Sequence, residues 1–155
     1  MPILADFTII QRDEHPNANA QFGSGTFDDP YVIGDTSTQP SGAGRLELGF
    51  GTGGCHNSGG LLSMMINGLT LDSASVRVNG FQVGRLQPTR DATTREARIW
   101  RHQQFIVPGN LLNPANSDTA NTLIIGRADH TNPSSGNLFD DFRVRDIVCF
   151  FHQVG

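Results

Sequence analysis

Hydrophobic and polar positions alternate with a period of two along much of the chain, as in strands that bury one face. The clearest case is Ala74–Arg85, where Val76 and Val78 alternate with polar neighbours. Asn79-Gly80 then supplies two residues that tolerate a positive φ in a tight turn, and the strand pattern resumes after them. We therefore predict a β-hairpin over this segment.

Further segments of strand length lie on both sides of this hairpin. Leu4–Gln11 is predicted near a sheet edge, and Thr26–Ile33 as a loop that enters a short strand, because Pro30 cannot donate a ladder hydrogen bond. Leu61–Leu71 is predicted as a strand, a turn at a second Asn-Gly pair and a returning strand. The remaining candidates are Arg45–Phe50, the extended end of Glu96–Val107, and Asn121–Ala128.

Leu138–His152 is the longest strand candidate. Four of its even positions, Phe142, Val144, Val148 and Phe150, are apolar, and from Ile147 onward both faces are apolar. This pattern predicts a strand that is central in its sheet and buried on both sides. The run Ile147–Phe151 (IVCFF) also motivates an association hypothesis, because one of its faces needs a cover from a loop or another subunit.

About eight strands at short spacings, without a credible amphipathic helix of twelve residues, indicate an all-β protein. The 18 Gly and 8 Pro residues fit many turns between short strands. A chain of 155 residues without an obvious linker or repeat is predicted to form a single domain over residues 1–155. The expected architecture is an antiparallel β-sandwich, specifically a jelly roll.

The charge pattern excludes some classes of function. The net charge is −4, and all 11 basic residues are Arg, so we exclude a nucleic-acid binder, which normally carries a basic excess. No apolar run is long enough for a membrane span, and the start of the chain lacks the pattern of a signal peptide. The location of the protein stays open: it is cytoplasmic, exported by another route, or exported by a signal that has been removed. Cys55 and Cys149 are expected to be free or, less often, paired.

Three segments in order resemble the galactose-binding-domain-like jelly rolls, a family of carbohydrate-binding-module-type β-sandwiches. They are the series VRVNGFQVG from Val76 to Gly84, then Phe105–Pro108 with Leu111-Leu112, then Asn121–Ile125. The resemblance covers Ala74 to Ala128, about a third of the chain. It departs from the family at Ala120, where the family usually has Gly.

This resemblance implies a jelly-roll fold and a non-catalytic, lectin-like carbohydrate-binding domain with a surface or loop site. Other members of the family mediate protein contacts. The alternative is therefore a structural or assembly subunit that forms a symmetric homo-oligomer through packing of its β-sandwich.

The candidate ligand-binding residues fall in one region and comprise Arg85, Arg98, Trp100, Arg101 and His102. An exposed indole offers an apolar platform to a sugar face, and guanidinium and imidazole groups can donate hydrogen bonds to hydroxyl or acidic groups. Two alternatives stay open, since Trp100 can instead be a core residue and the Arg residues a solvated loop.

Two doubled carboxylates, Asp28-Asp29 and Asp140-Asp141, suggest a shared Ca²⁺ site, because this cation prefers oxygen ligands. Asp129 and Asp146 are possible additional ligands. The alternative reading is that these residues are solvated turn residues.

No pattern in the sequence indicates an enzyme. The five His residues lack metal-ligand spacing, and no Gly-x-Ser-x-Gly elbow occurs. Gly49-x-Gly51-x-x-Gly54 fits a dinucleotide motif, but Gly59-Gly60 follow where its helix would have to run. Catalytic carboxylates that meet only in space stay an open alternative.

Overall fold

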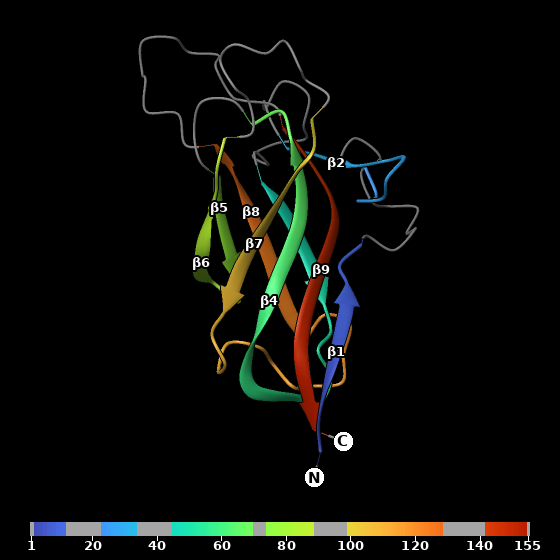
Figure 1. Cartoon of the computed structure of the whole chain (residues 1–155), viewed down its shortest axis with the longest axis vertical. Helices are drawn as coiled ribbons and strands as arrows, with labels where there is room; N and C mark the ends of the chain where they lie inside the picture. Colours follow the sequence, from blue (N-terminus) through green and yellow to red (C-terminus); the bar gives the residue numbers. More distant parts are fainter. Residues whose placement is uncertain are drawn as a thin grey trace.

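The computed structural model describes residues 2–11, 23–33, 45–69, 74–88, 99–128 and 142–154 as two packed antiparallel sheets (Figure 1). Within these ranges there is no helix, and so none that is long and apolar enough to cross a membrane. The strands are β1 (Ile3–Ile9), β2 (Tyr31–Ile33), β3 (Leu46–Phe50), β4 (Cys55–Asn67), β5 (Ala74–Val78), β6 (Phe81–Leu86), β7 (Arg101–Val107), β8 (Asn121–Ala128) and β9 (Phe142–Val154).

The strand order is that of a jelly roll. One sheet has the order β1-β9-β4-β7, with β2 pairing the part of β9 that β1 does not reach; we call it the five-stranded sheet. The other, the four-stranded sheet, has the order β3-β8-β5-β6. The predicted all-β antiparallel sandwich is therefore confirmed, with nine strands rather than about eight in the described part.

The core lies between the two sheets and follows the period of two. In β3 the side chains of Leu46, Leu48 and Phe50 are buried while those between them are exposed. In β4 the residues Leu62, Met64 and Ile66 point into the same core. Each such side chain contributes about 1.5–3 kcal/mol by leaving water. Alternation along the strands thus fixes which face of each sheet points inward.

The predicted hairpin is confirmed as β5, a two-residue turn and β6. Asn79 and Gly80 have φ angles of 48° and 81°, as a type I′ turn requires at both central positions. The strand predictions before and after it, at the sheet edge near the N-terminus, in β2, β3, β7 and β8, are also confirmed.

Within Leu61–Leu71, the predicted strand is confirmed as the last part of β4, which runs from Cys55 to Asn67. The predicted return after the Asn-Gly pair lies largely outside the described residues. The glycine-rich segment before Leu61 belongs to β4: a Cβ at Gly60 would lie 2.7 Å from the carbonyl oxygen of Phe150 on β9. The pair Asn67-Gly68 ends β4. Gly68 has a φ of 84°, and the Asn67 side chain donates to the carbonyl of Ile99 at 2.9 Å.

The prediction that the end of β9 is buried on both sides is wrong. An irregularity between Arg145 and Ile147, where Asp146 has a φ of 51°, shifts the inward positions from Val144 to Ile147 and then to Cys149. Phe150 consequently points outward and is 45% exposed. The strand is central in its sheet, between β1 and β4, and no described segment covers its outer face at Phe150.

Candidate functional site

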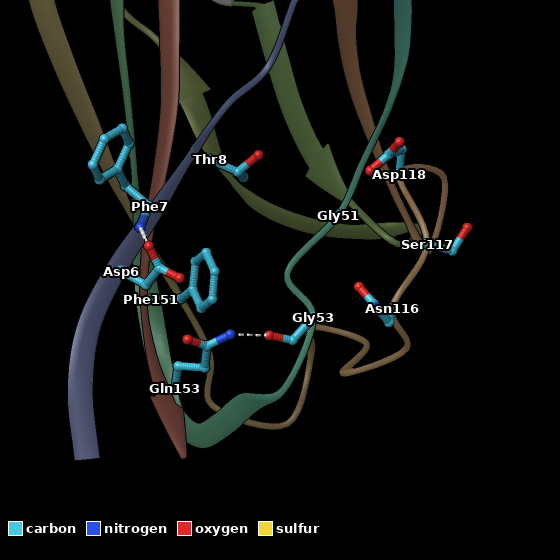
Figure 2. A pocket seen from close by; sticks show the side chains of 10 residues that line it. All are labelled: Asp6, Phe7, Thr8, Gly51, Gly53, Asn116, Ser117, Asp118, Phe151 and Gln153. Carbon is cyan, nitrogen blue, oxygen red and sulfur yellow. Dashed lines mark hydrogen bonds between the residues drawn. The ribbon is translucent and has the colours of Figure 1, made fainter. Parts of the chain in front are cut away.

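A pocket of about 220 Å³ lies at the end of the sandwich where the N-terminal strand meets two loops. Its walls come from β1 and β9 of the five-stranded sheet, from the turn between β3 and β4, and from the loop between β7 and β8 (residues 108–120). Figure 2 shows these segments around the cavity. The pocket thus brings together parts of the chain that are far apart in the sequence.

The sheet side of the pocket carries Asp6, Thr8, Phe151 and Gln153 (Figure 2). Asp6 accepts a hydrogen bond from the backbone N–H of Phe7 at 2.8 Å, whereas the Phe7 ring points away from the cavity. The side-chain amide of Gln153 donates to the carbonyl of Gly53 at 2.7 Å, which holds the β3–β4 turn against β9. Phe151 belongs to the core and presents only a small part of its ring.

The loop side carries Asn116, Ser117 and Asp118. The Ser117 hydroxyl is engaged within the loop, since it lies 3.2 Å from the Thr119 hydroxyl and accepts from the Thr119 backbone N–H. Among the described residues, none hydrogen-bonds to the side chains of Asn116 or Asp118. An amide and a carboxylate are therefore available to a ligand at this wall.

Two glycines let the loops approach each other closely enough to form the pocket. A Cβ at Gly51 would lie 2.8 Å from the carbonyl oxygen of Ser117, and one at Gly53 would lie 3.0 Å from the side-chain oxygen of Asn116. The half-glycine composition of residues 51–60, which suggested only a flexible loop, thus has a packing reason in this turn.

A buried polar network fixes the other end of the 108–120 loop. Asn121, which is fully buried, donates to the Thr52 hydroxyl at 2.9 Å and accepts from the backbone N–H of Asn113 at 2.7 Å. The Thr52 hydroxyl donates in turn to the carbonyl of Asn113. Since each of these groups is paired, the pocket wall is anchored to both the β3–β4 turn and the start of β8.

This arrangement can bind a small polar ligand rich in hydroxyl groups. Carboxylate and amide groups are planar and accept or donate in fixed directions, which suits neighbouring hydroxyls of a sugar ring. The two carboxylates, Asp6 and Asp118, make the pocket acidic and so disfavour an anionic ligand. The sequence analysis missed this site, because no spacing in the sequence connects the four segments that build it.

Three of the ligand-binding residues predicted from the sequence, Trp100, Arg101 and His102, lie elsewhere, at the β7 edge of the five-stranded sheet. Trp100 directly precedes β7 and is neither fully buried nor fully exposed. The guanidinium of Arg145 lies 4.3 Å from the centre of its ring, so one face of the indole is occupied.

Arg101 and His102 follow each other in β7 and therefore point to opposite faces of the sheet. His102 is exposed and hydrogen-bonds to the Ser63 hydroxyl on β4. Arg85 lies in β6 of the other sheet and is half-buried. Arg98 lies outside the described residues. The structure therefore brings Trp100 and His102 to one edge but leaves the full predicted set as a prediction.

Arg145 was not singled out by the sequence analysis, although it organises the region around Trp100. Its side chain is about nine-tenths buried between the rings of Phe27 and Trp100, each 4.3 Å from the guanidinium carbon. One guanidinium nitrogen lies 3.4 Å from the Asp146 carboxylate. A cation between two aromatic faces is stabilised by both ring quadrupoles, so this cluster closes the outer face at this end.

The predicted Ca²⁺ site falls partly outside the described residues, since Asp140 and Asp141 do. Asp28 and Asp29 are exposed in the turn before β2, where the Asp29 carbonyl accepts from the backbone N–H groups of Ser24 and Gly25. Asp146 reaches the same turn through a hydrogen bond from its N–H to the Gly25 carbonyl. Among the described residues, no three acidic, His or Cys side chains are grouped as a metal would require.

Comparisons with known proteins give similarity in structure only. No known protein-family model matches the sequence, and no curated protein matches it. Two solved structures of mutants of CBM29-2, described as probing ligand recognition by Family 29 carbohydrate binding modules, each show 15% identity and a TM-score of 0.46 over 95% of this chain and 92–93% of theirs. The catalytic unit of a GH87 alpha-1,3-glucanase from Streptomyces thermodiastaticus shows 14% identity and a TM-score of 0.40, over all of this chain and 26% of that one.

Proposed function

We propose that this chain is a non-catalytic carbohydrate-binding domain that binds a glycan in the pocket of Figure 2. The observation that carries the proposal is the polar lining of that pocket, with the Asn116 amide and the Asp118 carboxylate facing Asp6 across the cavity. The resemblance of Ala74–Ala128 to galactose-binding-domain-like jelly rolls supports the same class of ligand.

The charge of the pocket narrows the class of glycan. Asp6 and Asp118 repel uronic acids and sulfated sugars, whereas hydroxyl groups of neutral sugars donate well to carboxylates. The volume of about 220 Å³ suits one or two sugar units rather than the flat surface of a crystalline polymer. We expect neutral or amino sugars at a chain end.

A glycan array followed by titration calorimetry tests this proposal. Asp118→Ala is expected to weaken binding by roughly 10- to 100-fold, because a hydrogen bond to a charged group contributes about 1.5–3 kcal/mol. Glu47→Ala is the matched control, since it removes a carboxylate from the exposed face of β3, away from the pocket. Equal affinities for the wild type and Asp118→Ala would contradict the proposed site.

The Arg85–His102 region is the second candidate site, and its chemistry is distinguishable. Guanidinium groups favour acidic or sulfated glycans, which the pocket rejects. If binding requires an acidic glycan and is lost in Trp100→Ala while Asp118→Ala still binds, the site is at the β7 edge.

The proposal that the domain is not an enzyme has its own test. Asp6 and Asp118 both line the pocket, and two carboxylates are the usual catalytic pair of glycoside hydrolases. We expect no release of reducing sugar when the protein is incubated with any oligosaccharide that it binds. Hydrolysis that Asp6→Asn or Asp118→Asn abolishes would overturn the non-catalytic assignment.

A further inference from the structure

The outer face of the five-stranded sheet carries a row of apolar side chains that crosses four strands. The registers pair Phe7 of β1 with Phe150 of β9, Phe150 with Leu61 of β4, and Leu61 with Ile106 of β7. Directly opposed residues share a face, so these four side chains lie next to one another across the sheet. Figure 1 shows the four strands side by side in the nearer sheet.

This row is exposed. Phe7, Phe150 and Ile106 have exposed fractions of 58%, 45% and 78%, and the rings of Phe7 and Phe150 lie 6.2 Å apart. The paired positions Ile9 and Val148, and Ile3 and Val154, extend it along β1 and β9. We call these eight residues the apolar face.

The exposed area of the apolar face approaches that of one side of a protein interface. The exposed fractions of its six most exposed members add up to about three fully exposed side chains. At about 200 Å² for each side chain, the exposed apolar area is roughly 600 Å². Specific interfaces bury about 800 Å² on each partner. The two half-exposed members of the apolar face, Leu61 and Val148, add to its exposed area and bring the total closer to this value. Scattered apolar residues on a monomer do not form a continuous row of this kind.

The charge distribution suits a second copy of this chain. The chain carries a net charge of −4, so two copies repel each other wherever acidic surfaces meet. The apolar face itself contains no charged residue, and the residues paired beside it, Ala5 with His152 and Ser63 with Gln104, have no carboxylate. The carboxylate of Asp6 on the same strand lines the pocket instead.

A glycan is a poorer occupant of this face. Sugar platforms need several convergent hydrogen-bonding groups. The row from Phe7 to Ile106 has none among its own side chains, and those beside it, His152, Ser63 and Gln104, lie on both sides of the row and do not converge. Four of the eight residues are Ile or Leu, whose branched side chains interdigitate with those of another sheet.

We infer that this chain forms a symmetric homodimer in which the apolar faces of two copies pack against each other. The same patch on both copies makes the contact self-complementary, so the assembly closes at two and does not continue into a filament. The contact leaves the pocket open at the end of each sandwich, because the Phe7 ring and the pocket lie on opposite sides of β1.

Sedimentation equilibrium over a concentration series tests the inference. We expect a dimer at micromolar concentration, and Ile106→Glu is expected to raise its dissociation constant by roughly 100-fold or more, since the buried unpaired charge occurs twice in a symmetric contact. Phe81→Glu is the matched control: Phe81 is 55% exposed but lies in β6 of the other sheet, so the dimer should persist.

The outcomes separate this inference from the proposed function. A wild-type protein that stays monomeric at high micromolar concentration overturns the dimer, and so does a dimer that Ile106→Glu leaves intact. Ile106→Glu protein that is monomeric and binds glycan with wild-type affinity supports it. If Ile106→Glu abolishes binding to a polysaccharide in a protein that was never dimeric, the occupant is a glycan and the inference is wrong.

Discussion

At the scale of single residues, two asparagines explain why the segments that resemble a family pattern occur together. The Asn79 side chain donates to the Asn121 side-chain oxygen at 2.9 Å and to the Leu111 carbonyl at 2.7 Å, and accepts from the backbone N–H of Thr122. The turn of the hairpin, the end of the 108–120 loop and the start of β8 are therefore tied by one hydrogen-bond network. The Asn residues of the pattern therefore connect these segments to one another.

Asn121→Ala is expected to lower the free energy of unfolding by about 2–4 kcal/mol. The substitution leaves the backbone N–H of Asn113 and the Asn79 amide without the acceptor that they share, and it removes the bonds that the fully buried Asn121 amide donates to Thr52 and Phe50. Urea unfolding measures the loss. Asn110→Ala, at an exposed position of the same loop, is the control and should change stability by less than about 0.5 kcal/mol. Equal effects for both variants would show that the network contributes little.

The second residue-scale prediction concerns Cys149, a residue of β9 whose side chain is fully buried on the inner face of the sheet. Burial, with a smaller contribution from Cys55, raises the pKa of the Cys149 thiol from 9.0 to about 12. Between these values the unfolded chain loses the proton and the folded protein keeps it. The free energy of unfolding should therefore fall as the pH rises through this range, by at most about 1.4 kcal/mol per pH unit.

Unfolding by urea under reducing conditions at about pH 8 and about pH 10.5 checks the direction of this effect. Cys149→Ala should show a smaller loss between the two pH values than the wild type, because its side chain does not titrate. A loss of the same size in both proteins would assign the effect to other groups.

At the scale of elements, the β5–β6 hairpin permits two glycine substitutions with different causes. Gly80→Ala places a side chain at a φ of 81°, with no atom within 4 Å of the added Cβ, so only the backbone conformation is penalised, by about 1 kcal/mol. Gly84→Ala puts its Cβ 2.4 Å from the Phe105 ring of β7 and should cost more, because that ring must move. Melting temperatures rank the two variants, and Gly80→Asn should recover most of the first loss.

Strands were predictable from the sequence wherever one face of the strand is buried and the other is exposed to solvent. β3 and β5 show this alternation, and both were identified with nearly correct bounds. The pattern failed where a local feature changed its phase, because the irregularity at Asp146 exchanged the faces of β9. Asn67-Gly68 ends β4, and the return expected after this pair lies largely outside the described residues. A turn dipeptide specifies a local conformation, while tertiary packing decides whether the chain pairs back.

At the scale of the whole molecule, the sandwich class followed from composition and strand spacing, but the pocket did not. Asp6, Gly51, Asn116 and Gln153 lie on four elements, and only the pairing of β1 with β9 and the approach of two loops bring them together. Trp100 was selected as a site residue because it is the single indole of the chain. Arg145, whose guanidinium packs on that indole, is about 45 residues away in the sequence and was not predicted. Residue type alone was a weaker guide than topology.

The calcium hypothesis is also a prediction about the whole molecule, because it links the turn before β2 with the segment before β9. Ca²⁺ that binds only the folded protein stabilises it by mass action. Millimolar Ca²⁺ should therefore raise the melting temperature, and a chelator should reverse the change, whereas the Asp28→Asn, Asp29→Asn double variant should not respond. A melting temperature that is insensitive to Ca²⁺ and chelator in the wild type would remove the site.

The last prediction concerns folding, which in this topology depends on contacts between the two ends of the chain. β1 pairs with β9, from Ile3 opposite Val154 to Ile9 opposite Val148, and β4 in the middle of the sequence pairs with the other side of β9. Such distant pairings must close large loops before they stabilise the protein, so we expect refolding in milliseconds to seconds rather than microseconds. Trp100 is the only indole and packs on Arg145 of β9, so its fluorescence reports the formation of this sheet in a stopped-flow experiment. A fluorescence change that is complete in well under about a millisecond would show that Trp100 and Arg145 meet before the terminal strands pair.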